Sequence, residues 1–167
     1  VEMWEKVYNY DPAYADVEIR LESYKNLAED DPIRDFLLTP ASQIEKKTRE
    51  IVRKMGYKVK SSKLYNPDEV DVTATDDKED LHLFSFKRWI HPVGDMVVKE
   101  VRTKMLDLEA IKAHIFTCGD FTRSAVEYAE SRQIELYPRD AFREILRTVT
   151  AAQKPSDSVS SPRKENA

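Results

Sequence analysis

Hydrophobic and polar residues alternate with a period of two in residues 57–61 and 70–75, and residues 81–89 begin with the apolar bulk of a buried strand. These three segments in the first half of the chain are predicted to form β-strands. The polar residues 76–80 lie between the second and third segments and predict a five-residue loop. The second and third strands should therefore pair as an antiparallel hairpin.

Segments with the periodicity of a helix precede and follow these three strands in the sequence. Apolar side chains in residues 39–55 are spaced for one face of a helix, with Thr39 as the predicted N-cap, Pro40 in the first turn and Gly56 as the stop. A second helix with a face of valine, methionine and leucine is predicted at about 95–109.

The second half of the chain alternates between strands and helices. Residues 112–118 and 134–138 read as strands, residues 121–132 as a short helix and residues 139–149 as a closing helix. A meander followed by crossover helices predicts an α/β fold, in which a mixed sheet is flanked by helices on both faces.

The segments outside this unit have a different character. Residues 1–38 are rich in Tyr, Asp and Glu and are expected to be a partly helical extension, anchored by Trp4, Tyr8 and Tyr24. Residues 150–167 are rich in Ser and charged residues and are expected to be a disordered tail. The domain itself is predicted to span residues 39–149.

Composition narrows the class of protein. The 167 residues are 41% hydrophobic and 35% charged, with a net charge of −4, so no global basic field indicates nucleic-acid binding. One cysteine, Cys118, excludes an intramolecular disulfide and suits a reducing, cytoplasmic location, where we expect it in the core. No apolar run reaches the length of a membrane span. The first residue is Val, as in a processed chain or a piece of a longer protein.

Polar residues that could bind a metal or take part in catalysis lie together on the predicted hairpin. Paired residue numbers should sum to about 156, which sets Asp71 opposite Ser85 with Lys87 one step diagonal. Glu45, at the edge of the apolar stripe of the first helix, is expected to lean over the sheet near Asp71. Two carboxylates, a hydroxyl and an ammonium are suited to holding Mg²⁺ and activating a water.

Each of these residues also has an ordinary interpretation. An aspartate on a strand is often a solvated residue next to a turn, and Lys87 at a strand end can reach for solvent. His82 and His91 are expected to be surface residues, because no second histidine lies at metal-ligand spacing.

The order of these motifs resembles a known family. The run "MGYKVKSSKLYNPDEVDVTATDDKEDLHLFSFKRWIHPVGDMVVKEVRTKM" and the later "IFTCGDFTRSAVEYAESRQIELYPRDAF" are similar to the catalytic domain of Mrr-type restriction endonucleases, in the PD-(D/E)xK nuclease superfamily. The resemblance covers about residues 39–148. It implies a restriction-endonuclease-like fold and Mg²⁺- or Mn²⁺-dependent cleavage of DNA.

Carried over by position, the resemblance implies that Glu45 and Asp71 are metal ligands and that Lys87 is the catalytic lysine. The chain departs from the pattern at the (Glu/Gln)-x-Lys motif, which reads Ser85-Phe86-Lys87. Some restriction enzymes with Ser-x-Lys take the missing carboxylate from the following helix. Glu100 is the residue here that would supply it, although a pair with Lys104 at i+4 explains Glu100 equally well.

Basic side chains near the hairpin are candidates for contacts with the DNA backbone. They are equally explained as the solvated side of ordinary helices. The candidates are Arg88, Lys99, Arg102, Lys104 and Arg123.

Three functions therefore compete. The first is a Mg²⁺-dependent DNA endonuclease weakened by Ser85. The second is a catalytically inactive nuclease fold used for DNA binding or assembly. The third is a protein-interaction domain within a larger complex. Under any of the three, the chain is expected to act as a homodimer or as part of a larger protein.

Overall fold

The computed structural model describes residues 31–149, and its centre is a five-stranded sheet in the order β1-β2-β3-β4-β5. β1 to β3 form an antiparallel meander, whereas β3, β4 and β5 are parallel. The predicted mixed sheet is therefore confirmed. The strands are β1 (Lys58–Asn66), β2 (Glu69–Thr75), β3 (Leu81–Lys87), β4 (Lys112–Thr117) and β5 (Ile134–Tyr137).

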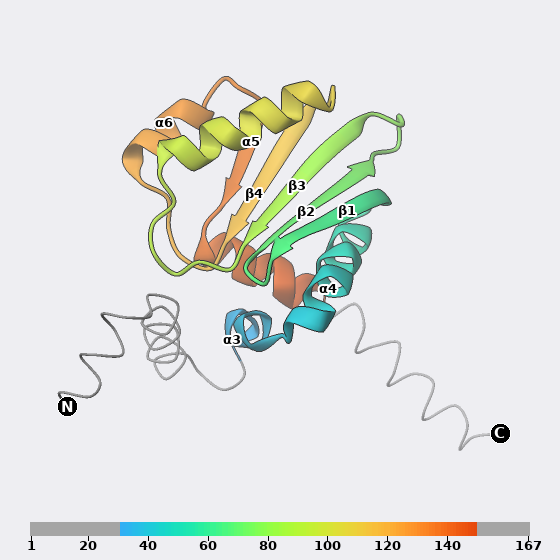
Figure 1. Ribbon diagram of the computed structural model, residues 1–167, viewed down its shortest axis with the longest axis vertical. Coiled ribbons are helices and arrows are strands. Elements are labelled where there is room, and N and C mark those ends of the chain that lie inside the picture. The colour runs from blue at the N-terminus through green and yellow to red at the C-terminus, as the bar shows by residue number, and fades with distance from the viewer. Residues whose placement is uncertain (1–30, 150–167) are drawn as a thin grey trace, which may run out of the picture.

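Helices cover both faces of the sheet, as predicted. Figure 1 shows α5 and α6 on one face, and α3, α4 and the last helix on the other. No helix within residues 31–149 is both long and apolar enough to cross a membrane. The helices are α3 (Pro32–Leu38), α4 (Ala41–Lys54), α5 (Asp95–Asp107), α6 (Arg123–Ala129) and a last helix at 139–149.

The central strands divide their side chains between two cores. Val70, Val72 and Phe84 pack in the core under α4, and Leu83 packs in the core under α5. Because successive strand residues point to opposite faces, the odd-numbered residues of β2 and β3 all point toward α5. These odd-numbered residues include every polar candidate of the hairpin. Cys118 is buried in the core under α4, as expected.

Two element boundaries differ from those predicted. β1 continues to Asn66, so the turn before β2 is confined to residues 67–68. α4 begins at Ala41 with Pro40 as its N-cap, whereas Thr39 ends α3 and donates a hydrogen bond from Oγ1 to the Asp35 carbonyl at 2.9 Å. Thr39 therefore caps the preceding helix and not the following one.

α3 belongs to the same folded unit as the sheet. Ile33 and Phe36 are completely buried in the core under α4, and Arg143 of the last helix pairs with Asp31 at 3.2 Å. α3 therefore contributes to the same core although it precedes residue 39, where the domain is predicted to start. The rest of the predicted extension, with Trp4, Tyr8 and Tyr24, and the predicted tail lie outside the described residues.

Arg88 ties α3 to the β1–β2 turn. Its side chain is 5% exposed and donates hydrogen bonds to the carbonyls of Pro67, Phe36, Leu37 and Thr39. A guanidinium with five fixed donors suits such a cluster of carbonyls. Arg88 is therefore a structural residue, which corrects the expectation that it contacts DNA phosphates.

His82 is part of a buried hydrogen-bonded chain, and the expectation that it lies at the surface is wrong. Its Nε2 lies 2.9 Å from Asp76 Oδ2, and its Nδ1 lies 3.0 Å from His114 Nε2. His114 Nδ1 lies 3.3 Å from the Tyr137 hydroxyl. Burial, followed by the charges of His82 and Lys112, lowers the pKa of His114 to about 3. His114 is therefore neutral in the folded protein at ordinary pH.

Acid should destabilise the domain through His114. Its pKa is about 6.5 unfolded and about 3 folded, so the unfolded state binds more protons between these values. We expect the free energy of unfolding to fall by up to about 1.4 kcal/mol per pH unit below pH 6.5. His114→Phe, which keeps the stack on Phe84, should flatten this dependence in urea unfolding between pH 6.5 and 5. Equal slopes for the two proteins would contradict the assignment.

Candidate active site

Four polar residues form a square on the α5 side of β2 and β3. Asp71 pairs with Ser85 and Glu69 pairs with Lys87 in the antiparallel register, which confirms the predicted sum of 156. We call Glu69, Asp71, Ser85 and Lys87 the quartet. Ser85 is completely buried, and Lys87 and Asp71 are 3% and 6% exposed. Three members of the quartet are therefore buried, whereas the side chain of Glu69 is 28% exposed.

Glu69 is the member of the quartet that the sequence reasoning missed. Its Oε1 accepts a hydrogen bond from Lys87 Nζ at 3.0 Å, and its Oε2 accepts one from Asn66 Nδ2 at 3.0 Å. Burial opposes its ionisation, but the hydrogen bonds from Asn66 and Lys87 outweigh burial and lower the pKa of Glu69. The register itself carried the signal, because 69 and 87 also sum to 156.

Lys104 reaches down from α5 and pairs with Asp71. The distance from Lys104 Nζ to Asp71 Oδ2 is 3.1 Å. Burial disfavours the charged form of Lys104, but the negative charge of Asp71 and its hydrogen bond outweigh burial and raise the pKa of Lys104. Lys104 was expected at a DNA backbone or in a pair with Glu100, and the structure instead places it at the candidate site.

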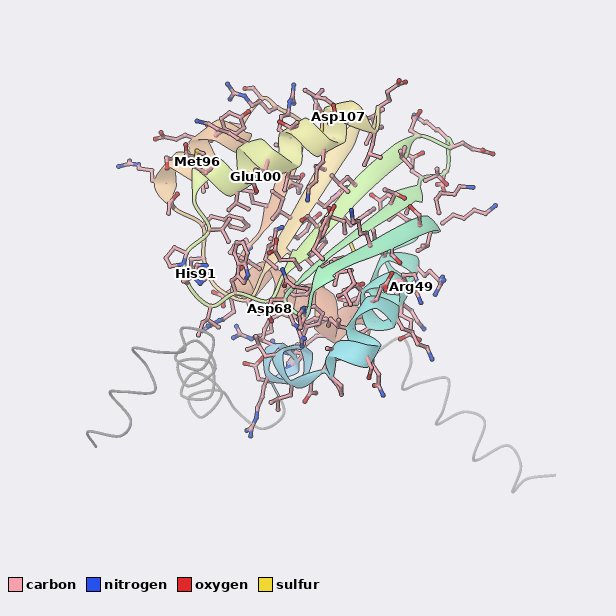
Figure 2. All side chains as sticks on the ribbon, viewed as in Figure 1. Arg49, Asp68, His91, Met96, Glu100 and Asp107 are labelled. Atoms are coloured by element: carbon pink, nitrogen blue, oxygen red, sulfur yellow. The ribbon has the colours of Figure 1, made fainter. Side chains whose placement is uncertain are left out.

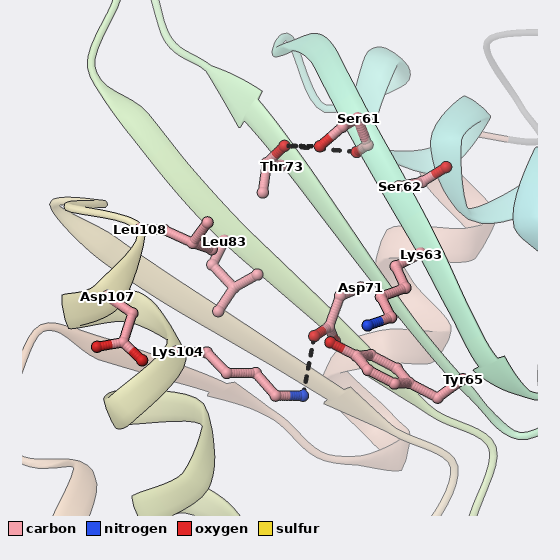
Figure 3. A pocket seen from close by; sticks show the side chains of 10 residues that line it. All are labelled: Ser61, Ser62, Lys63, Tyr65, Asp71, Thr73, Leu83, Lys104, Asp107 and Leu108. Carbon is pink, nitrogen blue, oxygen red and sulfur yellow. Dashed lines mark hydrogen bonds and ion pairs between the residues drawn. The ribbon is translucent and has the colours of Figure 1, made fainter.

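Tyr65 of β1 completes the surroundings of Asp71. The Lys104 ammonium lies 4.2 Å from the centre of the Tyr65 ring, and Lys63 lies over the same ring at 4.8 Å. Burial and the negative charge of Asp71 raise the pKa of Tyr65, so the hydroxyl stays protonated at neutral pH. In Figure 3, side chains from β1 and α5 converge on Asp71.

A pocket of about 330 Å³ opens between β1, β2 and the C-terminal half of α5. Asp71 and Lys104 lie in its wall, so the most buried carboxylate of the quartet is next to an open space. Ten residues line the pocket: Ser61, Ser62, Lys63, Tyr65, Asp71, Thr73, Leu83, Lys104, Asp107 and Leu108.

Two buried oxygens of the quartet have no hydrogen-bond partner among the described residues. They are Asp71 Oδ1 and Ser85 Oγ, which belong to directly opposed residues of the hairpin. A buried polar atom left without a partner costs about 1–3 kcal/mol, so each one requires an explanation, of which a bound water or ion is one. Both oxygens have lone pairs that such a group could use.

Glu45 does not join this arrangement. α4 covers the opposite face of the sheet, and Glu45 accepts a hydrogen bond from Ser62 at 2.5 Å and pairs with Arg49 at 3.5 Å. Figure 2 shows Arg49 on α4 below the sheet, whereas Asp107 and Glu100 lie on α5 above it. The expectation that Glu45 leans over Asp71 is therefore not met.

Glu100 is exposed on α5, and no contact joins it to the quartet within the described residues. Its alternative partner Lys104 is taken by Asp71, at 3.1 Å. Across residues 31–149, no three His, Cys, Asp or Glu side chains come together in a way that would hold a metal ion. The three-carboxylate set expected for a metal is thus not assembled.

The remaining basic candidates lie around α6. Lys99 pairs with Asp95 and lies over the ring of Tyr128, and Arg102 donates to the carbonyl of Arg132. Arg123 is 92% exposed at the start of α6. These three side chains therefore lie on the α5–α6 side of the domain and do not line the pocket that contains Lys104.

Comparison with known proteins agrees with this fold. The model of the Mrr catalytic domain family, described as a restriction endonuclease, matches residues 39–146. The matched residues contain the five-stranded sheet and its charged central hairpin, so this domain is that of a nuclease family. The chain belongs to the Mrr-type restriction endonuclease family. No curated protein matches the chain.

The chain is also similar to the solved structure of EndoMS in its apo form. The two chains are 14% identical, with a TM-score of 0.44, over 55% of this chain and 44% of the EndoMS chain. The chain thus spans less than half the length of that structure.

Proposed function

We propose that this domain hydrolyses the phosphodiester backbone of DNA at the quartet, with Mg²⁺ or Mn²⁺ held at Asp71. The observation that supports it is the pair of orphaned oxygens, Asp71 Oδ1 and Ser85 Oγ, beside Lys87. Membership of a restriction endonuclease family supplies the substrate class, DNA.

The residues present suit a weak cation site. Mg²⁺ prefers oxygen ligands and is commonly held by one or two carboxylates, with phosphate oxygens and waters completing its shell. Asp71 offers one free carboxylate oxygen, and Ser85 offers a neutral hydroxyl beside it. Because Ser85 carries no charge, affinity in the absence of DNA should be low and the DNA phosphate should contribute to binding.

The side chains around Asp71 suit the hydrolysis of a phosphodiester bond. A bound divalent cation would lower the pKa of a water and offset phosphate charge. Lys87 is held by Glu69 at 3.0 Å, one diagonal step from Asp71, so its ammonium can stabilise charge that develops on a phosphate bound at Asp71. Tyr65 keeps its proton and can donate a hydrogen bond, and the exposed Lys63 can neutralise a neighbouring phosphate.

A second function, DNA binding without cleavage, is favoured by the charge balance of the site. Two carboxylates, Glu69 and Asp71, are each matched by one ammonium, from Lys87 and Lys104. A site that is neutral by itself attracts a dication less than a site with excess negative charge. The inactive module therefore remains the alternative for the quartet.

Nicking of supercoiled plasmid separates the two functions. We expect the full chain to nick plasmid in Mg²⁺ or Mn²⁺, to stop in EDTA, and to lose nicking with Asp71→Asn. DNA binding is measured in parallel at increasing salt, and it should weaken steeply if phosphate contacts dominate. Salt-sensitive binding without nicking under any metal condition would establish the inactive module, and absence of both would reject DNA as the substrate.

A further inference from the structure

Ser85 leaves the proposed cation site with one carboxylate, and the structure offers a second one at a different position. We infer that Glu69 is the second anionic ligand of the cation, and that it takes the part that Ser85 cannot play. This inference rests on the proposed function and assigns one more residue to the same site.

The strand geometry brings Glu69 to the right place. Glu69 and Asp71 lie two residues apart on β2, so both side chains point toward α5. Glu69 is also the diagonal neighbour of Ser85, a separation of about 7–8 Å between Cα atoms that long side chains can bridge. A carboxylate one methylene longer than that of aspartate can therefore reach toward the orphaned oxygens.

The contacts of Glu69 favour it over the other acidic candidates. Its carboxylate is already 3.0 Å from Lys87, so it belongs to the same charged cluster as the proposed catalytic lysine. Its side chain is 28% exposed, against 7% for Asp71, which places it toward solvent where an ion could enter. Glu45 is turned to Ser62, and Glu100 is exposed on α5 without a contact to the quartet in the described part of the chain.

The hydroxyl of Ser85 is evidence independent of this acidic pair. Ser85 is completely buried and its Oγ lacks a hydrogen-bond partner in residues 31–149, as does Oδ1 of Asp71 opposite it. A cation that these two oxygens hold from one side needs further ligands from the other. Glu69 is the nearest carboxylate along the strand, and its Oε2, which accepts from Asn66, can turn to the cation while Oε1 keeps Lys87 in place.

Metal binding without DNA tests the inference directly. Mn²⁺ affinity is measured by calorimetry on the full chain, and Glu69→Gln should weaken it by about tenfold because one anionic ligand becomes neutral. Glu135→Gln is the matched control, since Glu135 also pairs with a lysine, Lys112 at 3.1 Å, but lies on β5 outside the pocket, and it should change the affinity less than twofold. Glu100→Gln tests the helix alternative in the same way.

A rescue experiment excludes a merely structural effect. If Glu69 replaces the missing carboxylate, the double variant Glu69→Gln with Ser85→Glu should recover Mn²⁺ affinity to the wild-type value or above. Wild-type affinity in Glu69→Gln, with loss of binding in Asp71→Asn, would overturn the inference and leave the proposed function standing. Loss of affinity in Glu100→Gln instead would move the ligand to α5, and no effect of Asp71→Asn would reject the proposed function itself.

Discussion

Lys87→Met is expected to reduce plasmid nicking by at least about 100-fold while Mn²⁺ affinity is retained or raised, because Glu69 loses the cation that competes for its carboxylate. A fixed charge next to a reacting phosphate typically contributes rate factors of this size. Methionine keeps most of the side-chain volume against Trp89, so the loss reports charge and not packing. The ion pair with Glu69 is removed as well, which leaves that carboxylate with its Asn66 contact.

The comparison needs a lysine that is remote from the quartet. Lys60→Met suits this purpose, because Lys60 is exposed on the edge strand β1 and lies outside the pocket wall. Nicking rates of the two variants are compared at saturating Mn²⁺, after DNA affinity has been measured for each. Unchanged nicking in Lys87→Met would show that Lys87 serves only to pair with Glu69.

The hairpin could be predicted from the sequence because its register depends on residues that are close together in the chain. A short polar loop between two alternating strands fixes the register, and the register placed Asp71 opposite Ser85 as observed. The same arithmetic would have paired Glu69 with Lys87. The family pattern gives roles to Asp71, to Lys87 and to the position of Ser85, and not to residue 69.

Contacts between distant elements were much harder to predict. Glu45 was assigned to the site because it lies at the edge of an apolar stripe, but the stripe does not say which face of the sheet the helix covers. α4 packs on Val70 and Val72, which point away from Asp71. Arg88 was likewise read as a surface cation, and only the carbonyl-rich end of α3 explains its burial.

Lys104 is the contact that changes the chemistry of the site most. The i+4 spacing from Glu100 predicted an ordinary pair on the helix surface. α5 instead lies across β2 and β3, so Lys104 meets Asp71 at 3.1 Å across 33 residues of sequence. The Lys104 ammonium thus pairs with the carboxylate that a divalent cation would need. The ammonium and the divalent cation would therefore compete for Asp71.

Lys104→Met should therefore raise Mn²⁺ affinity, measured by calorimetry without DNA, by about tenfold. A unit positive charge a few Å from a dication repels it by a few kcal/mol at surface dielectric, and partial exposure of Lys104 reduces this effect. Without metal, the variant leaves Asp71 as a buried carboxylate that has lost its cation, so its melting temperature should fall and should recover more on adding Mn²⁺ than that of wild type.

Lys112→Met provides the matched control for this competition. Lys112 also pairs with a carboxylate at 3.1 Å, Glu135, and its side chain is 36% exposed against 34% for Lys104, but it lies on β4 away from the pocket. It should alter neither Mn²⁺ affinity nor the rise in melting temperature that Mn²⁺ produces. If Lys104→Met bound Mn²⁺ no better than Lys112→Met, the cation would not approach Asp71 from the side of α5, and the orphaned oxygens would have to be reached from the edge of the quartet at Glu69.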